Sequence, residues 1–137
     1  MQPLGSDAVN ALACDEALAG ALAGADLVVA NLEGTFHHHS VGALALGGAL
    51  ALAHRLGRPV WAINGTVDAI DPWLLAATLE PAAHVAVREP CSGRWLRARG
   101  IVATASADAA SLAETFAARP PGPPSGSPVT AINPPIA

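Results

Sequence analysis

The stretch DLVVANLEGTFHHHS, residues 26–40, sets the fold class of this chain. Its first part is short, apolar and β-branched, which is typical of a buried strand, and a polar turn then leads into a helix. The same order of elements returns along the chain. We expect further strands at 59–64, 84–89 and 101–105, and helices at 10–25, 40–57, 71–80, 90–100 and 108–118. This alternation predicts an α/β fold, a Rossmann-like three-layer domain with a mainly parallel sheet and helices on both faces.

The composition divides the chain of 137 residues into two regions. Residues 1–118 predict one Rossmann-like α/β domain. Residues 119–137 hold seven of the twelve prolines, so they cannot form a central strand or helix, and we expect an extended or disordered tail. The longest apolar run, residues 41–53, is shorter than the roughly 20 residues that a helix needs to span a bilayer, so we expect no membrane span.

Charge and cysteine content limit the classes of function. The formal net charge is −4 and there is no basic tract, which argues against a nucleic-acid partner. Cys14 and Cys91 are isolated in the sequence, and no signal peptide opens the chain, so a reduced cytoplasmic setting is expected. The sequence has no GxGxxG, Walker A or GxSxG motif, and we predict no cofactor.

Ligands of parallel α/β sheets bind beyond the carboxyl ends of the strands, which directs attention to LEGTFHHH, GTVDAID and REPCS. Glu33 follows the first strand in a turn with Gly34 and Thr35. Its carboxylate could accept a proton from a hydroxyl group or hydrogen-bond a sugar. The alternative is that Glu33 lies in solvent or at a helix N-terminus.

The three histidines at 37–39 are poor candidates for a metal site, because structural zinc sites use spaced ligands and no Cys or Asp partner lies at a recognisable spacing. We predict no metal. We expect one histidine to reach the cleft and the others to be surface or cap residues. Arg88 and Glu89 end the third strand, where the guanidinium suits a phosphate or carboxylate. Alternatively, the two side chains form ion pairs that tether neighbouring loops.

The order of these segments resembles the polysaccharide pyruvyl transferase family. The resemblance rests on ADLVVANLEGTFHHHS, ALAHRLGRPVWAING, VAVREPCSGRWLRARGI and the Asp of SADAASLAETF, and it covers roughly residues 8–118. It implies one half of a two-domain, GT-B-like enzyme of bacterial exopolysaccharide biosynthesis. Such enzymes transfer pyruvate from phosphoenolpyruvate to a polysaccharide sugar as a ketal.

The resemblance also implies site residues. Glu33, Gly34, Thr35 and His37 match the family's EGT-x-H turn, with Glu33 and His37 as the expected catalytic pair. The family's REs-x-S segment matches at Arg88, Glu89 and Ser92, which together with Gly34 and Thr35 are expected to bind substrate. The implied partners are phosphoenolpyruvate and a sugar or polysaccharide acceptor.

This chain departs from the family pattern in three places. Leu32 stands where members often have glycine, Cys91 lies within the second segment, and the family's opening Gly-Asn-x-Gly-Asp-type loop is missing. We expect the second domain, which supplies much of the phosphoenolpyruvate site, to be missing as well, so that the chain by itself is inactive. The alternatives are a non-catalytic sugar- or nucleotide-binding Rossmann-like module, or half of another GT-B glycosyltransferase.

Overall fold

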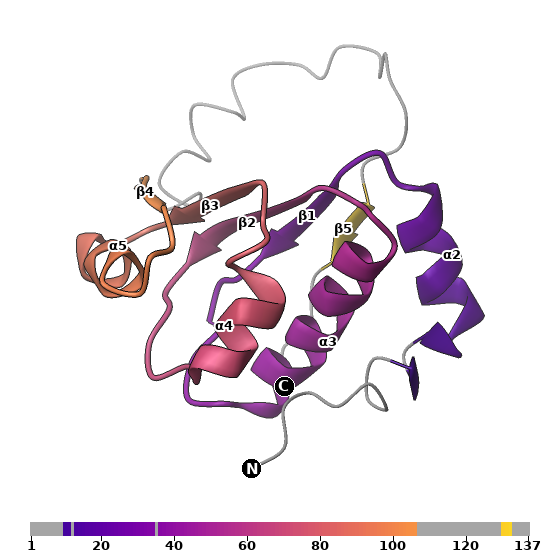
Figure 1. Ribbon diagram of the computed structural model, residues 1–137, viewed down its shortest axis with the longest axis horizontal. Helices are drawn as coiled ribbons and strands as arrows, with labels where there is room; N and C mark the ends of the chain where they lie inside the picture. The colour runs from indigo at the N-terminus through magenta and orange to yellow at the C-terminus, as the bar shows by residue number, and fades with distance from the viewer. Residues whose placement is uncertain (1–9, 12, 35, 107–129, 133–137) are drawn as a thin grey trace.

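The computed structural model describes residues 10–11, 13–34, 36–106 and 130–132 (Figure 1). Its sheet has five strands in the order β4-β3-β2-β1-β5, and every neighbouring pair is parallel. The strands are β1 (Val28–Asn31), β2 (Val60–Gly65), β3 (His84–Val87), β4 (Thr104–Ala105) and β5 (Thr130–Ile132). The predicted fold class, α/β with a Rossmann-like parallel sheet, is confirmed.

In the part of the chain that the structure describes, four helices alternate with the strands. They are α2 (Glu16–Gly24), α3 (Val41–Arg55), α4 (Pro72–Thr78) and α5 (Pro90–Arg97). The side chain of Ser40 accepts a hydrogen bond from the backbone N–H of Ala43 and so caps the start of α3. Asp71 stands at the N-cap of α4 without a side-chain cap bond, and Pro72 begins that helix.

The predicted helix at 10–25 is interrupted at Cys14 and Asp15. Asp15 accepts hydrogen bonds from the backbone N–H groups of Ala17 and Leu18 and so starts a new helix, α2. The predicted strand at 101–105 is regular only at 104–105. The predicted helix at 108–118 lies outside the described residues.

Within the segment predicted as a proline-rich tail, Thr130–Ile132 form β5, which pairs with β1 at one edge of the sheet. An edge strand tolerates nearby proline because one side of its backbone needs no partner. The prediction for the rest of this segment, 119–129 and 133–137, concerns residues that the structure does not describe.

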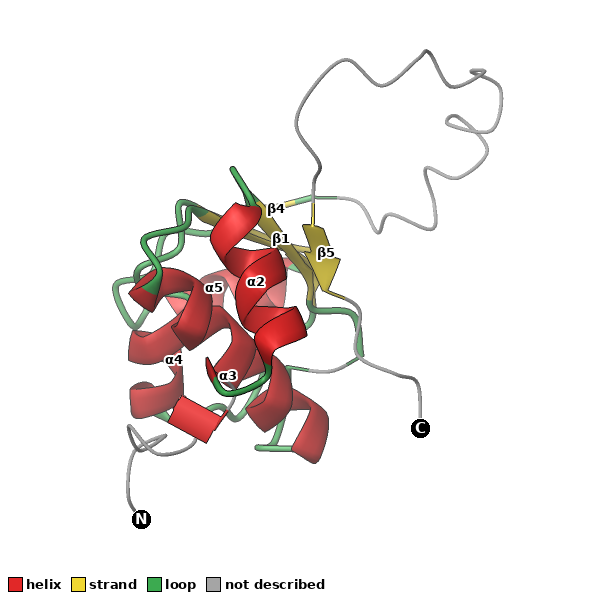
Figure 2. Ribbon diagram, turned by 90° about the vertical axis from the view of Figure 1, so that its right-hand side faces the viewer, coloured by secondary structure: helices red, strands yellow, loops and turns green. Residues whose placement is uncertain are grey.

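The main core lies between the sheet and the helices. Alternate strand residues, such as Val28, Ala30, Val60 and Ala62, face the helices and are fully buried. The helices contribute their apolar sides to this core, with Leu22, Leu46, Leu50, Leu52, Leu74, Leu75 and Leu96 as the largest buried side chains. Figure 2 shows the described helices on one side of the sheet. No helix among the described residues is long and apolar enough to cross a membrane.

Candidate functional site

Six polar residues converge at the carboxyl ends of β1, β2 and β3. They form what we call the strand-end cluster, which consists of Asn31, Glu33, Asn64, Thr66, Arg88 and Glu89. Because parallel strands bring their carboxyl ends to one edge of the sheet, residues far apart in the sequence become neighbours. Two of the segments that the sequence analysis singled out, LEGTFHHH and REPCS, therefore meet at this edge, through Glu33 and the neighbouring Arg88.

Glu33 is held from two sides. The side-chain amide of Asn64 donates to Glu33 Oε2 at 3.1 Å, and Arg88 Nη1 lies 3.4 Å from Glu33 Oε1. The Glu33 side chain keeps 47% of its surface exposed, so a ligand in solution can reach the carboxylate. The ion pair with Arg88 also ties two loops together, as the tethering alternative for Arg88 predicts.

Asn64 is the residue of this cluster that links β1 and β2. It is only 6% exposed, and its Nδ2 donates to Asn31 Oδ1 at 3.2 Å as well as to Glu33. Asn31 Oδ1 also accepts from the backbone N–H of Glu33 at 3.2 Å. The backbone of Asn64 is left-handed, with a φ of 57°, which asparagine tolerates better than most residues. The two asparagines therefore fix where Glu33 stands.

A second chain of hydrogen bonds runs from Arg88 to α5. Arg88 Nε donates to the Thr66 hydroxyl at 2.9 Å, and the Thr66 hydroxyl donates to the Glu89 carboxylate. The Cys91 thiol donates to Glu89 Oε2 at 2.9 Å. These bonds, that of Cys91 first and that of Thr66 second, lower the pKa of Glu89, and the charge of Arg88 acts in the same direction. Glu89 therefore stays ionised near neutral pH.

Of the other two predicted substrate-binding residues that the structure describes, Ser92 is buried and Gly34 lies in the exposed turn after Glu33. Ser92 is only 3% exposed, and its hydroxyl accepts from the backbone N–H of Val67 at 3.1 Å, which joins the start of α5 to the loop after β2. Gly34 has a φ of 64°, so the turn after Glu33 uses glycine's freedom in the left-handed region. Thr35 is outside the described residues.

His37 is turned toward its own loop. Its Nε2 lies 3.0 Å from the Gly34 carbonyl, so it donates there, and its Nδ1 lies 3.2 Å from Nδ1 of His38. The backbone of His37 forms an isolated bridge with Asp68. His37 is close to Glu33 in the sequence, but the contacts of its ring are with Gly34 and His38.

His39 connects two loops of the fold. Its Nε2 accepts from the backbone N–H of Asp71 at 2.8 Å, and its ring stacks on Trp73 at a centroid distance of 6.2 Å. It therefore joins the loop before α3 to the start of α4. Across the residues that the structure describes, no group of three His, Cys, Asp or Glu side chains is placed to hold a metal ion.

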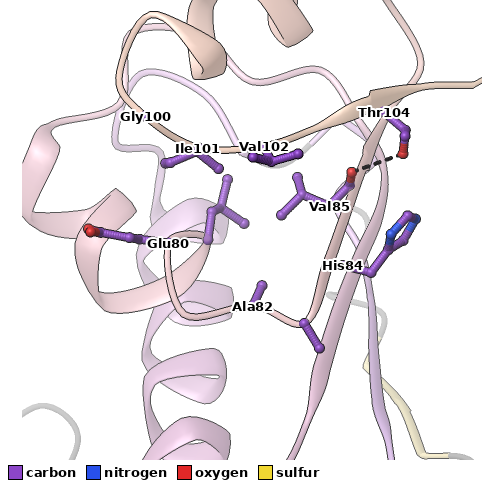
Figure 3. Close-up of a pocket in the computed structure, with 10 residues that line it drawn as sticks. Glu80, Ala82, His84, Val85, Gly100, Ile101, Val102 and Thr104 are labelled. Carbon is purple, nitrogen blue, oxygen red and sulfur yellow. Dashed lines mark hydrogen bonds between the residues drawn. The ribbon is translucent and has the colours of Figure 1, made fainter.

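A hollow of about 270 Å³ lies at the other end of the sheet, near the start of β3 and β4 (Figure 3). It is lined by Leu79, Glu80, Ala82, Ala83, His84, Val85, Gly100, Ile101, Val102 and Thr104. Its polar side chains are Glu80, His84 and Thr104, and the Thr104 hydroxyl donates to the Val85 carbonyl at 3.2 Å. The strand-end cluster joins six polar side chains by hydrogen bonds, which makes it the better candidate site for a polar substrate.

The sequence analysis did not select Asn31 and Asn64, and it included Thr66 only as part of the segment GTVDAID, without a role. Their signal was present in the sequence, since Asn31 and the Asn64-Gly65-Thr66 turn end two predicted strands. A search for known proteins similar to this chain finds no matching family model, curated protein or solved structure.

Proposed function

We propose that this chain is a polysaccharide pyruvyl transferase-like domain whose strand-end cluster holds the hydroxyl groups of a saccharide acceptor. The observation that carries the proposal is the meeting of Glu33 and Arg88 at 3.4 Å. The two residues come from the two segments that resemble the family's motifs, and 55 positions separate them in the sequence.

The contacts of Glu33 suit a base or an acceptor for sugar hydroxyls. Its carboxylate is exposed, which allows a hydroxyl group to approach, while Asn64 and Arg88 restrict its orientation. In the proposed reaction two acceptor hydroxyls add to the substituted carbon of phosphoenolpyruvate and phosphate leaves. One hydroxyl proton ends on the methylene carbon and the other on phosphate. Glu33 would accept such a proton in transit.

The charge balance of the cluster favours the acceptor over phosphoenolpyruvate. Glu33 and Glu89 contribute two negative charges and Arg88 contributes one positive charge. Phosphoenolpyruvate carries a phosphate and a carboxylate, which call for several converging cations or helix N-termini. We therefore propose that the phosphoenolpyruvate site needs cations from another domain or chain, and that the isolated chain does not turn over.

The same charge balance favours a second candidate, a saccharide-binding module without chemistry. A cluster of amide, hydroxyl and carboxylate groups can bind a neutral polyol without any reaction. For either candidate we propose the bacterial cytoplasm as the location. The free cysteines Cys14 and Cys91, both exposed, are in keeping with a reducing compartment.

The proposal is tested by calorimetric titration of the purified chain with oligosaccharides that can carry pyruvate ketals, with and without phosphoenolpyruvate. We expect saccharide binding that Glu33→Gln weakens about tenfold, the equivalent of about 1.4 kcal/mol for a hydrogen bond to a charged group. Glu80→Gln is the matched control, because Glu80 is an exposed carboxylate at the hollow, away from the cluster. Absence of saccharide binding, or equal affinity for Glu33→Gln and the parent chain, would refute the proposal.

Phosphate release separates the two candidates. The isolated chain should release no phosphate from phosphoenolpyruvate in the presence of saccharide. A second domain could supply the further cations that phosphoenolpyruvate needs. If the chain is a transferase domain, adding such a domain should start the release of phosphate. If the chain is a binding module, no phosphate should be released. Turnover by the chain alone that disappears in Arg88→Ala would contradict the proposed need for further cations.

A further inference from the structure

Two imidazole nitrogens lie close together in the loop between β1 and α3. Nδ1 of His37 is 3.2 Å from Nδ1 of His38, and the ring centroids are 5.4 Å apart with an interplanar angle of 75°. Nitrogen ligands lie about 2.0–2.1 Å from a zinc ion, so two of them in a tetrahedral site are about 3.4 Å from each other. The separation of the two Nδ1 atoms is close to that value.

The Gly34 carbonyl decides which nitrogen of His37 can bind a metal ion. Because a carbonyl oxygen only accepts hydrogen bonds, Nε2 of His37, at 3.0 Å from it, carries the hydrogen. In the neutral imidazole, Nδ1 then carries the lone pair, on the side of His38. Metal-bound histidines usually donate their other N–H to a carbonyl or carboxylate, which orients the ring. His37 therefore has the tautomer and the supporting hydrogen bond of a metal ligand.

The loop backbone holds the two rings in place. His38 has a φ of 50°, in the left-handed region, and its N–H donates to the Asp68 carbonyl at 3.2 Å. His37 forms the isolated bridge with Asp68, and the fully buried Phe36 precedes it. The sequence prediction of no metal rested on the spacing of ligands in structural zinc sites. In a strand, consecutive side chains point to opposite faces, whereas in this turn the rings of two consecutive histidines lie in contact.

His39 belongs to a different set of contacts. Its Nε2 accepts from the backbone N–H of Asp71, and its ring stacks on Trp73. Two protein ligands thus remain, the partly buried His37 and the exposed His38, and water can complete the coordination. Imidazole nitrogen suits zinc, copper and nickel ions, whereas magnesium and calcium ions prefer oxygen ligands.

We propose that His37 and His38 bind one divalent transition-metal ion through their Nδ1 atoms. The ion replaces the hydrogen bond between the two rings and leaves the hydrogen bond from His37 to Gly34 in place. His38 then carries its hydrogen on Nε2, where its exposed side chain can donate to water. The proposal rests on these ring contacts and does not depend on saccharide binding.

Calorimetric titration with Zn²⁺ of the full chain, without an affinity tag, tests the proposal. Cys14→Ser and Cys91→Ser remove the exposed thiols, which are zinc ligands in their own right. In this background we expect saturable zinc binding that His37→Gln and His38→Gln each weaken at least tenfold. The matched control is His84→Gln on β3, which should keep the affinity of the parent. Circular dichroism reports whether each variant folds.

Imidazole nitrogen signals give a second readout that needs no substitution in the loop. Long-range ¹H–¹⁵N correlation spectra distinguish protonated, unprotonated and zinc-bound ring nitrogens. Without zinc, His37 should be the tautomer with hydrogen on Nε2. With zinc, both His37 and His38 should carry hydrogen on Nε2 and show a coordinated Nδ1.

Three results would overturn the proposal. The first is the absence of saturable zinc binding by the folded parent chain. The second is equal zinc affinity in the parent and in folded His37→Gln and His38→Gln, which would place the ion elsewhere. The third is zinc coordination through Nε2 of either ring, or an equally large loss of affinity in folded His39→Gln, since either would mean a site other than this Nδ1 pair.

Discussion

Replacing Asn64 by alanine and by glycine separates two contributions to the free energy of unfolding, that of its side-chain hydrogen bonds and that of its left-handed backbone. Either variant removes the hydrogen bonds from Nδ2 to Asn31 and Glu33. Each such bond contributes a net of about 0.5–1.5 kcal/mol, and the exposure of the Glu33 carboxylate keeps its share in the lower part of that range. The lost bonds therefore cost about 1–2 kcal/mol in the free energy of unfolding. Alanine adds roughly 1 kcal/mol because the φ of 57° lies in the left-handed region, where glycine is unstrained.

We therefore expect Asn64→Ala to lower the free energy of unfolding by about 2–3 kcal/mol and Asn64→Gly by about 1–2 kcal/mol. Urea denaturation followed by circular dichroism measures both values. Ala69 offers a matched control, because it is exposed and has a φ of 50° but no side-chain hydrogen bonds. Ala69→Gly should be neutral or stabilising by up to about 1 kcal/mol.

The reasoning is refuted if Asn64→Ala and Asn64→Gly both cost less than about 0.5 kcal/mol, which would mean that the two bonds contribute nothing. If both variants lost the same large free energy of unfolding, the contribution of the hydrogen bonds would stand. The argument that alanine is strained by the left-handed backbone would then be wrong. A double-mutant cycle between Asn64→Ala and Glu33→Ala completes the test. The two changes should not be additive, because each removes the hydrogen bond between Asn64 Nδ2 and Glu33 Oε2.

Three further predictions concern the surroundings of the cluster. Gly65→Ala should destabilise the fold by about 1–3 kcal/mol in urea, since its new Cβ would lie 3.0 Å from Leu32 Cδ1, whereas Gly93→Ala, with 3.5 Å to Val87, should be tolerated. Glu89→Gln should make the free energy of unfolding depend less steeply on pH below pH 4.5. The lowered pKa of Glu89 gives stability that is present above its usual value of 4.5 and is lost as pH falls through the folded value; an unchanged dependence on pH would contradict this. Ser92→Ala leaves the buried N–H of Val67 without its acceptor, so it should cost about 1–3 kcal/mol in thermal unfolding while saccharide affinity stays constant; lost affinity in a folded variant would make Ser92 a ligand.

The sequence predicted the parts of the fold that depend on local patterns. The strand at 26–31 and the helix that Ser40 caps were found because apolar periodicity and capping residues act over a few positions. The interruption at Asp15 was missed, because alanine and leucine on both sides favour a helix and hide the cap. β5 was missed because its pairing with β1 is a long-range contact, and prolines surround it in sequence.

The candidate site was predictable only in part. Glu33 and Arg88 were selected because each follows a strand, and the parallel sheet then brought them together. Asn64 was not selected, because its importance comes from two partners far away in the sequence: Asn31 at the end of β1, 33 positions away, and Glu33 just after that strand, 31 positions away. Ser92 matched a motif, but its burial against the loop after β2 depends on tertiary packing that no local pattern encodes.

Side-chain NMR tests most directly where a saccharide binds. The side-chain amide of Asn64 and the Nε–H of Arg88 both give ¹⁵N-correlated signals, and both groups belong to the strand-end cluster. The backbone N–H of Val102 reports on the hollow at the other end of the sheet. During titration with the oligosaccharides, the account predicts saturable shifts of the Asn64 and Arg88 signals and none at Val102. Shifts confined to Val102 and its neighbours, or no shift at Asn64 and Arg88 at saturating saccharide, would contradict it.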